Sequence, residues 1–166
     1  MGKPWSQDSQ PAISLLQRRR AQAELVARVY DVLQAEHGRQ AALETIAAAV
    51  EADARAAGKA FAAQAPAGPC LAHFATVLEV LGAGGQGLEL ADVEQGGDRF
   101  TYRVTRCGYL EMYAAMGIDP ELAYALSCGR DYAFAMGYHP RLKLERPRTL
   151  GRGDHDCLFN YVWADT

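Results

Sequence analysis

Two pairs of reactive side chains stand close together in the second half of the sequence. Cys128 precedes Asp131 by three residues, and His155 precedes Cys157 by two. A thiolate is a nucleophile and a metal ligand, a carboxylate binds cations, and imidazole transfers protons near neutral pH. These residues could line a reactive site, hold a metal, or belong to a helix and a hairpin in which the cysteines only pack as small apolar side chains.

The spacing of the first pair predicts a shared helix face. Asp119 can accept hydrogen bonds from free backbone N–H groups as an N-cap, and Pro120 suits the first helical position because it lacks an N–H. We predict a helix from Asp119 to about Met136, ended by Gly137. Residues three apart lie on the same side of a helix, so the thiol and the carboxylate can act there on one ligand.

The second pair lies at the start of an alternating segment. The alternation over residues 155–163 predicts a β-strand with His155 and Cys157 as neighbours on one face and Asp156 on the other. A turn with the sequence Leu-Gly-Arg-Gly-Asp precedes this strand, and the segment before the turn alternates as well. Residues 141–164 therefore predict a β-hairpin.

A first hairpin and three helices precede these elements. Residues 87–106 combine a glycine turn with an alternating strand, which predicts a hairpin. Apolar residues at helical spacing predict helices over 12–37, 40–64 and 71–81, with Gly38 ending the first. The predicted fold class is α+β, with a helical N-terminal half packed on a four-stranded, mainly antiparallel sheet made of two hairpins.

Composition indicates one globular domain. The chain has 166 residues, of which 49% are apolar and 22% charged, so we predict a flexible N-terminus over 1–10 and a single domain over 11–166. A formal net charge of -3 argues against nucleic acid as a partner. Neither a membrane-length apolar run nor a secretory signal is present, so we expect a cytoplasmic protein. Basic residues at 18–20 and 141–152 leave local anion binding open.

Three short motifs together resemble the L-2-amino-thiazoline-4-carboxylic acid hydrolase family. Cys107 follows a predicted strand that ends in Thr-Arg, and Cys128-Gly-Arg-Asp131 lies in a predicted helix. Gly-Asp-His-Asp-Cys157-Leu-Phe leads into the last predicted strand. The resemblance covers residues 70 to 163, and the combination is far more specific than any one of its pieces.

The resemblance implies hydrolytic opening of a five-membered cyclic isothiourea that carries a carboxylate, with an N-carbamoyl amino acid as product and no cofactor. This chemistry needs a thiolate or an activated water to attack the ring carbon, a carboxylate to hold the amidine nitrogens, and a proton for the leaving sulfur. The expected catalytic residues are Cys128, Cys157, Asp131 and His155, and the expected substrate-binding residues are Cys107, Arg130 and Arg148, the arginines being for the carboxylate.

Two alternatives to this mechanism stay open. Zinc takes Cys and His ligands, and Cys107, Cys128, His155 and Cys157 are the set that would bind it, although the sequence contains neither C-x-x-C nor H-E-x-x-H. The chain could also be a non-catalytic ligand-binding or sensor domain, which would use Asp131 and the arginines without a reactive thiol.

Besides a small-molecule substrate, the expected partner is a second copy of the chain, bound through the N-terminal helices. The apolar positions from Leu15 to Leu33 have the spacing of a helical interface, which predicts a homo-oligomer. The scattered cysteines are expected to be free thiols, and Cys70, which lies outside the three motifs, is expected to be structural.

Overall fold

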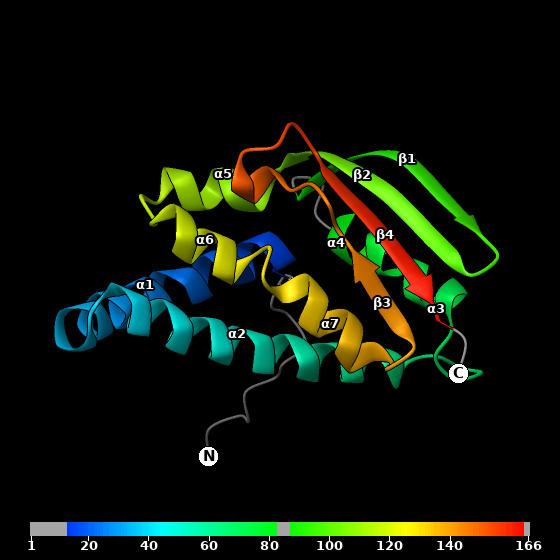
Figure 1. Ribbon diagram of the computed structural model, residues 1–166, viewed down its shortest axis with the longest axis horizontal. Helices are drawn as coiled ribbons and strands as arrows, with labels where there is room; N and C mark the ends of the chain where they lie inside the picture. The colour runs from blue at the N-terminus through cyan, green and yellow to red at the C-terminus, as the bar shows by residue number, and fades with distance from the viewer. Residues whose placement is uncertain (1–12, 83–86, 165–166) are drawn as a thin grey trace, which may run out of the picture.

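The computed structural model describes residues 13–82 and 87–164, and Figure 1 shows helices covering one face of a four-stranded antiparallel sheet. The predicted α+β fold is confirmed. The predicted flexible stretch, residues 1–10, lies outside the described residues, so that expectation and the domain bounds stay predictions.

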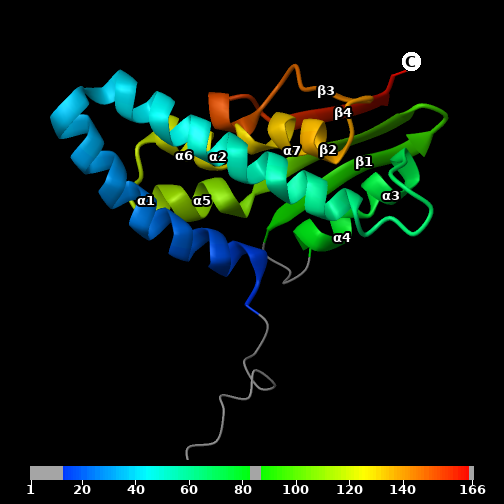
Figure 2. The same ribbon diagram turned by 90° about the horizontal axis from the view of Figure 1, so that it is seen from below.

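Two long helices form the base of the molecule. Helix α1 spans Leu15–His37 and α2 spans Arg39–Ala62, and they run antiparallel on either side of Gly38 (Figure 2). Ser14 caps α1 by accepting the Gln17 backbone N–H. Gly38 has a φ of +84°, a conformation that glycine adopts without the steric cost of a Cβ, which confirms its predicted role as a helix end.

The apolar stripe predicted on α1 does not all face the protein interior. The α1 side chains that are buried are Ala23 and Tyr30, whereas Leu25 is 69%, Val29 42% and Val32 56% exposed. These three exposed residues follow one another at helical spacing, and we call them the α1 stripe.

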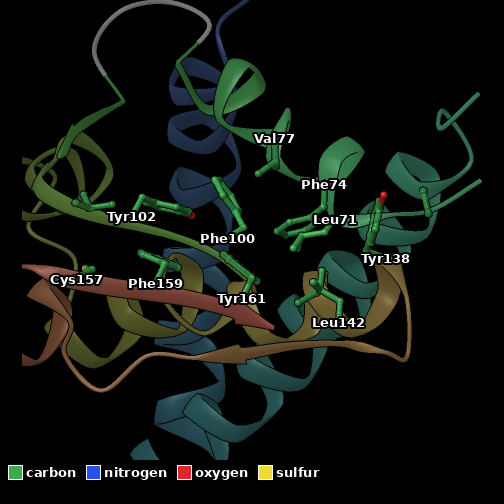
Figure 3. Packing of buried hydrophobic residues seen from close by; sticks show 13 residues of the cluster. Leu71, Phe74, Val77, Phe100, Tyr102, Tyr138, Leu142, Cys157, Phe159 and Tyr161 are labelled. Carbon is green, nitrogen blue, oxygen red and sulfur yellow. The ribbon is translucent and has the colours of Figure 1, made fainter. Parts of the chain in front are cut away.

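The sheet contains both predicted hairpins. Strand β1 (Leu88–Gly96) pairs with β2 (Arg99–Cys107), and β3 (Leu142–Glu145) pairs with β4 (Cys157–Trp163). The strand order is β1-β2-β4-β3, so the hairpins are joined through the antiparallel pair of β2 and β4. Residues on the covered face of these central strands are buried, including Phe100, Tyr102, Val104, Cys157, Phe159 and Tyr161 (Figure 3).

Two predicted helices are each interrupted. The segment after residue 70 forms α3 (Leu71–Ala75) and α4 (Val77–Gly82), because the Thr76 hydroxyl donates to the His73 carbonyl at the break. After α5 (Gly108–Ala115), the predicted Asp119–Met136 helix is wrong as one element: it forms α6 (Pro120–Leu126) and α7 (Arg130–Tyr138). Asp119 does cap α6 through the backbone N–H groups of residues 121 and 122.

The junction between α6 and α7 places Cys128 outside regular helix. Here the Gly129 N–H donates to the carbonyl of Tyr124, five residues earlier, instead of the usual partner four residues back. The chain then turns so that α7 packs on α2. The apolar spacing continues through residues 127–129, so the periodic pattern does not reveal this break; the glycine at 129 is the local signal for it.

Helix α7 lies between α2 and the sheet (Figure 1). A Cβ built on Gly137 would lie 2.1 Å from the Arg55 carbonyl oxygen, and one on Gly58 would lie 2.1 Å from the Phe134 carbonyl oxygen. Gly137 was predicted to end the helix, but it lies inside α7. Because it has no Cβ, it lets the backbones of α2 and α7 approach each other. In the described residues, no helix is long and apolar enough to cross a membrane.

Candidate functional site

Cys128 and Cys157 lie on two sides of one hydroxyl group. Both side chains are buried, with 5% exposed. The Cys157 S–H donates to Thr149 Oγ1 at 3.5 Å, and the Thr149 hydroxyl donates to Cys128 Sγ at 3.7 Å. The Leu150 backbone N–H in turn donates to Cys157 Sγ at 3.2 Å. The two thiols, which are 29 positions apart in the chain, therefore belong to one hydrogen-bonded cluster.

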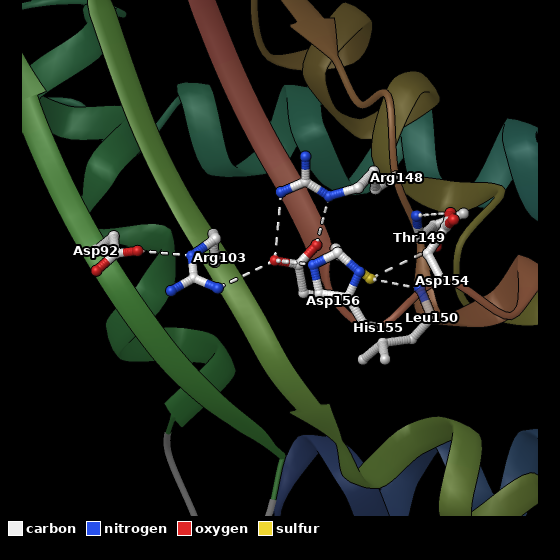
Figure 4. Close-up of polar contacts among 9 residues, drawn as sticks. Asp92, Arg103, Arg148, Thr149, Leu150, Asp154, His155 and Asp156 are labelled. Atoms are coloured by element: carbon white, nitrogen blue, oxygen red, sulfur yellow. Dashed lines mark hydrogen bonds and ion pairs between the residues drawn. The ribbon is translucent and has the colours of Figure 1, made fainter.

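A short turn of 3₁₀ helix, η1 (Leu150–Arg152), positions this hydroxyl. Thr149 is its N-cap, and the Asp154 carboxylate accepts the Thr149 backbone N–H at 2.8 Å (Figure 4). Gly153 closes the turn with a φ of +91°. Asp154 therefore acts within the turn, as its sequence position suggests.

Cys128 is covered by the same turn. A Cβ on Gly151 would lie 2.6 Å from Cys128 Sγ and 3.0 Å from the Tyr124 ring, so only glycine leaves room for the thiol in this arrangement. Burial raises the pKa of Cys128, and the hydrogen bond from Thr149 partly opposes that shift. At neutral pH the Cys128 side chain is consequently a protonated thiol.

Cys107 completes a group of three thiols. Cys107 is the last residue of β2, directly before α5, and it is half-buried. Burial raises the pKa of Cys107 to about 11, and the nearby Cys128 and Cys157 add to this shift. Cys70 lies elsewhere: it is exposed and caps α3 by accepting the His73 N–H at 3.5 Å.

The Asp131 carboxylate lies beside the thiols, paired with a buried arginine that the sequence analysis missed. The Arg146 side chain is only 1% exposed and donates to Asp131 and, at 2.9 Å, to the Cys128 carbonyl. Its Nε has no hydrogen-bond partner among the described residues. The alternation of β3 was the available signal, because it puts Arg146 on the same face as Leu142 and Leu144.

The pKa of the Asp131 carboxyl is raised above its usual range. Burial raises the pKa of this carboxyl to about 6, while Arg146 holds the value down. A half-buried carboxyl with such a pKa is suited to acid–base work or to holding a cation at neutral pH. The charge of Asp131 also acts on Cys128, whose pKa it helps to raise. The two groups are therefore close together, as expected, although Cys128 lies in the break between α6 and α7.

His155 is not on the face of Cys157, so its predicted placement is wrong. Strand β4 begins at Cys157, and the preceding residues 154–156 form a bend after Gly153. The His155 side chain is 76% exposed, and its Nε2 lies 3.5 Å from the Asp156 carboxylate. The alternation of the sequence therefore extends two residues beyond the strand itself.

Arg148 belongs to an ion-pair network on the same bend, shown in Figure 4. It donates to Asp156 at 2.7 Å, and Arg103 donates to the same carboxylate at 3.1 Å. Arg103 also pairs with Asp92 of β1 at 2.6 Å. The hydrogen bond from Arg148 lowers the pKa of Asp156 to about 2. Arg148 is thus already engaged with a buried carboxylate.

Arg130 points to the α1–α2 side of the α6–α7 junction. It donates to Asp53 at 2.5 Å, and Arg19 lies 3.8 Å from the same carboxylate oxygen. These side chains line a cavity of about 190 Å³ together with Tyr113. Sequence analysis noted the basic run that contains Arg19 but could not connect it to residue 130.

The proposed zinc ligands differ in their surroundings, because the His155 side chain is 76% exposed whereas Cys128 and Cys157 are buried. In residues 13–82 and 87–164, no group of three or more His, Cys, Asp or Glu side chains is arranged to hold a metal ion. The expectation of a reaction without metal or cofactor stays a prediction.

The site therefore combines two hydrogen-bonded thiols, a third thiol, and a carboxyl of raised pKa beside a buried arginine. A family model described as L-2-amino-thiazoline-4-carboxylic acid hydrolase matches residues 18–161, which include all the residues of this cluster. No curated protein matches the chain. The match spans most of the sequence, and the chain belongs to the L-2-amino-thiazoline-4-carboxylic acid hydrolase family.

Proposed function

We propose that the protein hydrolyses a small cyclic isothiourea or amidine of the 2-amino-thiazoline-4-carboxylate type to an N-carbamoyl amino acid. The observation that carries the proposal is the Thr149 hydroxyl shared by Cys128 and Cys157. It gives two thiols of one site different surroundings, which suits them to different roles. The family name, which is that of a hydrolase, supports the same reaction class.

Cys157 is the proposed nucleophile, because the Leu150 N–H that donates to its sulfur stabilises a thiolate. Its sulfur forms a bond to the ring carbon between the ring sulfur and nitrogen. The ring C–S bond then breaks, and the leaving sulfur takes the proton of Cys128, whose raised pKa keeps it a thiol. Asp131 holds the amidinium nitrogens as a cation during this step.

Water completes the reaction. It adds to the same carbon, returns one proton to Cys128, and expels the Cys157 thiolate, while the proton of the amidinium is released to solvent. The product carries a carbamoyl group on nitrogen and a free thiol. His155 has no part in this scheme, since its side chain is 76% exposed and lies beside the Asp156 carboxylate.

The first experiment measures turnover of L-2-amino-thiazoline-4-carboxylate by the full chain. We expect Cys157→Ser to lower kcat by at least about 100-fold and Cys128→Ser to lower it less, because water can replace a proton donor more easily than a nucleophile. Cys70→Ser is the matched control and should keep full activity. Full activity of Cys157→Ser would refute the assigned nucleophile, and absence of turnover in the wild-type protein would refute the substrate.

Burial of both thiols favours one second candidate, a non-catalytic ligand-binding domain, because a buried thiol is poorly reactive. Alkylation with iodoacetamide at mildly acidic pH separates the two functions. Selective modification of Cys157 supports the hydrolase, whereas uniformly inert Cys128 and Cys157 support the binder.

We also propose that turnover needs no metal and that the protein acts in the cytoplasm. Pretreatment with EDTA and 1,10-phenanthroline should leave kcat unchanged. Loss of activity that added Zn²⁺ restores would instead establish the zinc mechanism, in which a metal-bound water replaces the thiolate as attacking group.

A further inference from the structure

The cavity between α1, α2 and α5 is separate from the turn that covers Cys128. Its polar wall consists of Arg19 from α1, Gln22 one turn later, Asp53 from α2, Tyr113 from α5 and Arg130 from α7. The remaining wall is apolar and comes from Ala23, Val26, Ile46, Ala49, Val50 and Leu126. At about 190 Å³ the cavity is smaller than common drug pockets of roughly 300–1,000 Å³, so its ligand has to be small.

The charges in this cavity do not balance. The side chains of Arg19 and Arg130 are only 18% and 13% exposed, and both are directed at one carboxylate, that of Asp53. Asp53 is itself 59% exposed, so much of its charge is screened by water. Arg19 has one further partner, the side-chain carbonyl of Gln22 at 2.8 Å. Two guanidinium groups and one carboxylate leave a net positive charge in a largely apolar enclosure.

The positive charges of Arg19 and Arg130 repel each other across this cavity. Burial lowers the pKa of Arg19, and the charge of Arg130 lowers it further. A second anion near the two guanidinium groups would relieve this repulsion.

Tyr113 adds a hydrogen-bond donor to the cavity wall. The residue is 1% exposed and lines the cavity together with Arg19 and Arg130. Burial raises the pKa of Tyr113 to about 12, so the hydroxyl stays protonated and able to donate.

We propose that this cavity binds the carboxylate of a small acid, with Arg19, Arg130 and the Tyr113 hydroxyl as donors and the apolar wall against the part of the acid next to the carboxylate. Guanidinium groups bind carboxylates through charge-assisted, frequently bidentate hydrogen bonds. The apolar residues select a compact, uncharged body over inorganic anions such as phosphate.

Arg130 connects this cavity with the thiol site, because it lines the cavity and follows Cys128 by two residues at the start of α7. The identification of the bound acid as the substrate rests on the proposed function, whereas the affinity of the cavity for a carboxylate does not.

The binding test uses cyclopentanecarboxylate, which has no amidine to hydrolyse, and its neutral analogue cyclopentanecarboxamide. We expect 10 mM of the acid to raise the Tm of the full chain by about 3 °C, as for a Kd near 1 mM, and the amide to have no effect. Arg19→Gln and Arg130→Gln should each weaken binding by about tenfold, and Tyr113→Phe by less. Arg20→Gln is the matched control, because Arg20 is exposed and its ion pair within the described residues is with Glu24.

A shift of equal size with the acid and the amide would overturn the inference, as would no shift with the acid or equal shifts in all variants. Steady-state kinetics show which of the two proposals fails, the hydrolase activity or the carboxylate-binding cavity. If Arg130→Gln raises KM about tenfold with kcat nearly unchanged, the cavity holds the substrate carboxylate. Binding of the probe without any turnover refutes the hydrolase alone, and turnover that is unaffected by Arg19→Gln and Arg130→Gln refutes the cavity alone.

Discussion

Cys128 and Cys157 carry the same functional group in different hydrogen-bonded surroundings. Cys157 Sγ accepts a backbone N–H at 3.2 Å, while Cys128 lies beneath Gly151 and beside the negative charge of Asp131. The groups around each thiol, rather than the residue type, therefore distinguish the candidate nucleophile Cys157 from the candidate acid Cys128. Asp131 and Asp156 make the same point for carboxyl groups, because their pKa values are shifted in opposite directions.

The raised pKa of Asp131 predicts the acid limb of the pH–rate profile. Protonation below a pKa of about 6 removes the negative charge that holds the amidinium, so kcat/KM should fall as the pH drops through 6. Asp131→Asn should have much lower activity, and the pH–rate profile of the remaining activity should lack this acid limb. An unchanged limb in Asp131→Asn would assign it to another group.

The lowered pKa of Asp156 predicts an acid-sensitive fold. Its folded-state pKa of about 2 lies below the unfolded value of about 3.9, so between these values the unfolded chain binds more protons. The contribution of Asp156 is complete above about pH 5 and is lost as the pH falls through about 2. Urea unfolding between pH 4 and 2 should show a smaller loss in Asp156→Asn than in the wild type. Asp98→Asn, in the turn between β1 and β2, is the control and should follow the wild type.

At the scale of elements, close backbone contact between α2 and α7 sets the position of the α6–α7 junction. Gly58 and Gly137 allow this contact, and the chain must then leave helical geometry at residues 127–129 to continue from α6 into α7. The break buries Cys128 toward η1 and directs Arg130 toward α1 and α2. One irregular turn thus serves both the thiol cluster and the arginine cavity.

Gly137→Ala tests this contact. Its Cβ would lie 2.1 Å from a backbone oxygen that cannot rotate away, so we expect a loss of about 2–3 kcal/mol in the free energy of unfolding. Gly82→Ala is the control, because nothing lies within 4 Å of its added Cβ, and its effect should stay within about 0.5 kcal/mol. Equal effects in urea unfolding would show that the α2–α7 contact can relax.

The α1 stripe is the element on which the predicted self-association depends. Leu25, Val29 and Val32 expose apolar surface that a second copy could bury. We expect a dimer in sedimentation velocity experiments and a monomer after Val29→Glu. Val80→Glu changes an exposed valine of α4 and should leave the dimer intact. A monomeric wild-type protein would contradict the prediction.

At the scale of the whole molecule, two hydrophobic clusters meet near the candidate site. One lies between the sheet and α3, α4 and α7, and the other lies among α1, α2, α5 and α6. Cys107 packs against both clusters. The pairing of β2 with β4 brings Val104 opposite Cys157, which places the end of the first hairpin beside the start of the last strand. Sheet order therefore brings Cys107 and Cys157 toward each other, while the α6–α7 junction supplies Cys128.

The sequence by itself determined the elements. Apolar periodicity, the Asp119-Pro120 start and the glycine turns act within a few residues, so the two long N-terminal helices, the start of α6, both hairpins and the closeness of Cys128 to Asp131 could be predicted. Only the tertiary structure decided which distant groups meet: Thr149 between the thiols, Arg146 on Asp131, and Arg19 with Arg130 around Asp53. It also left the His155 side chain 76% exposed. The reason is that these contacts depend on how α7 packs on α2 and how β4 leaves its turn, which local patterns do not encode.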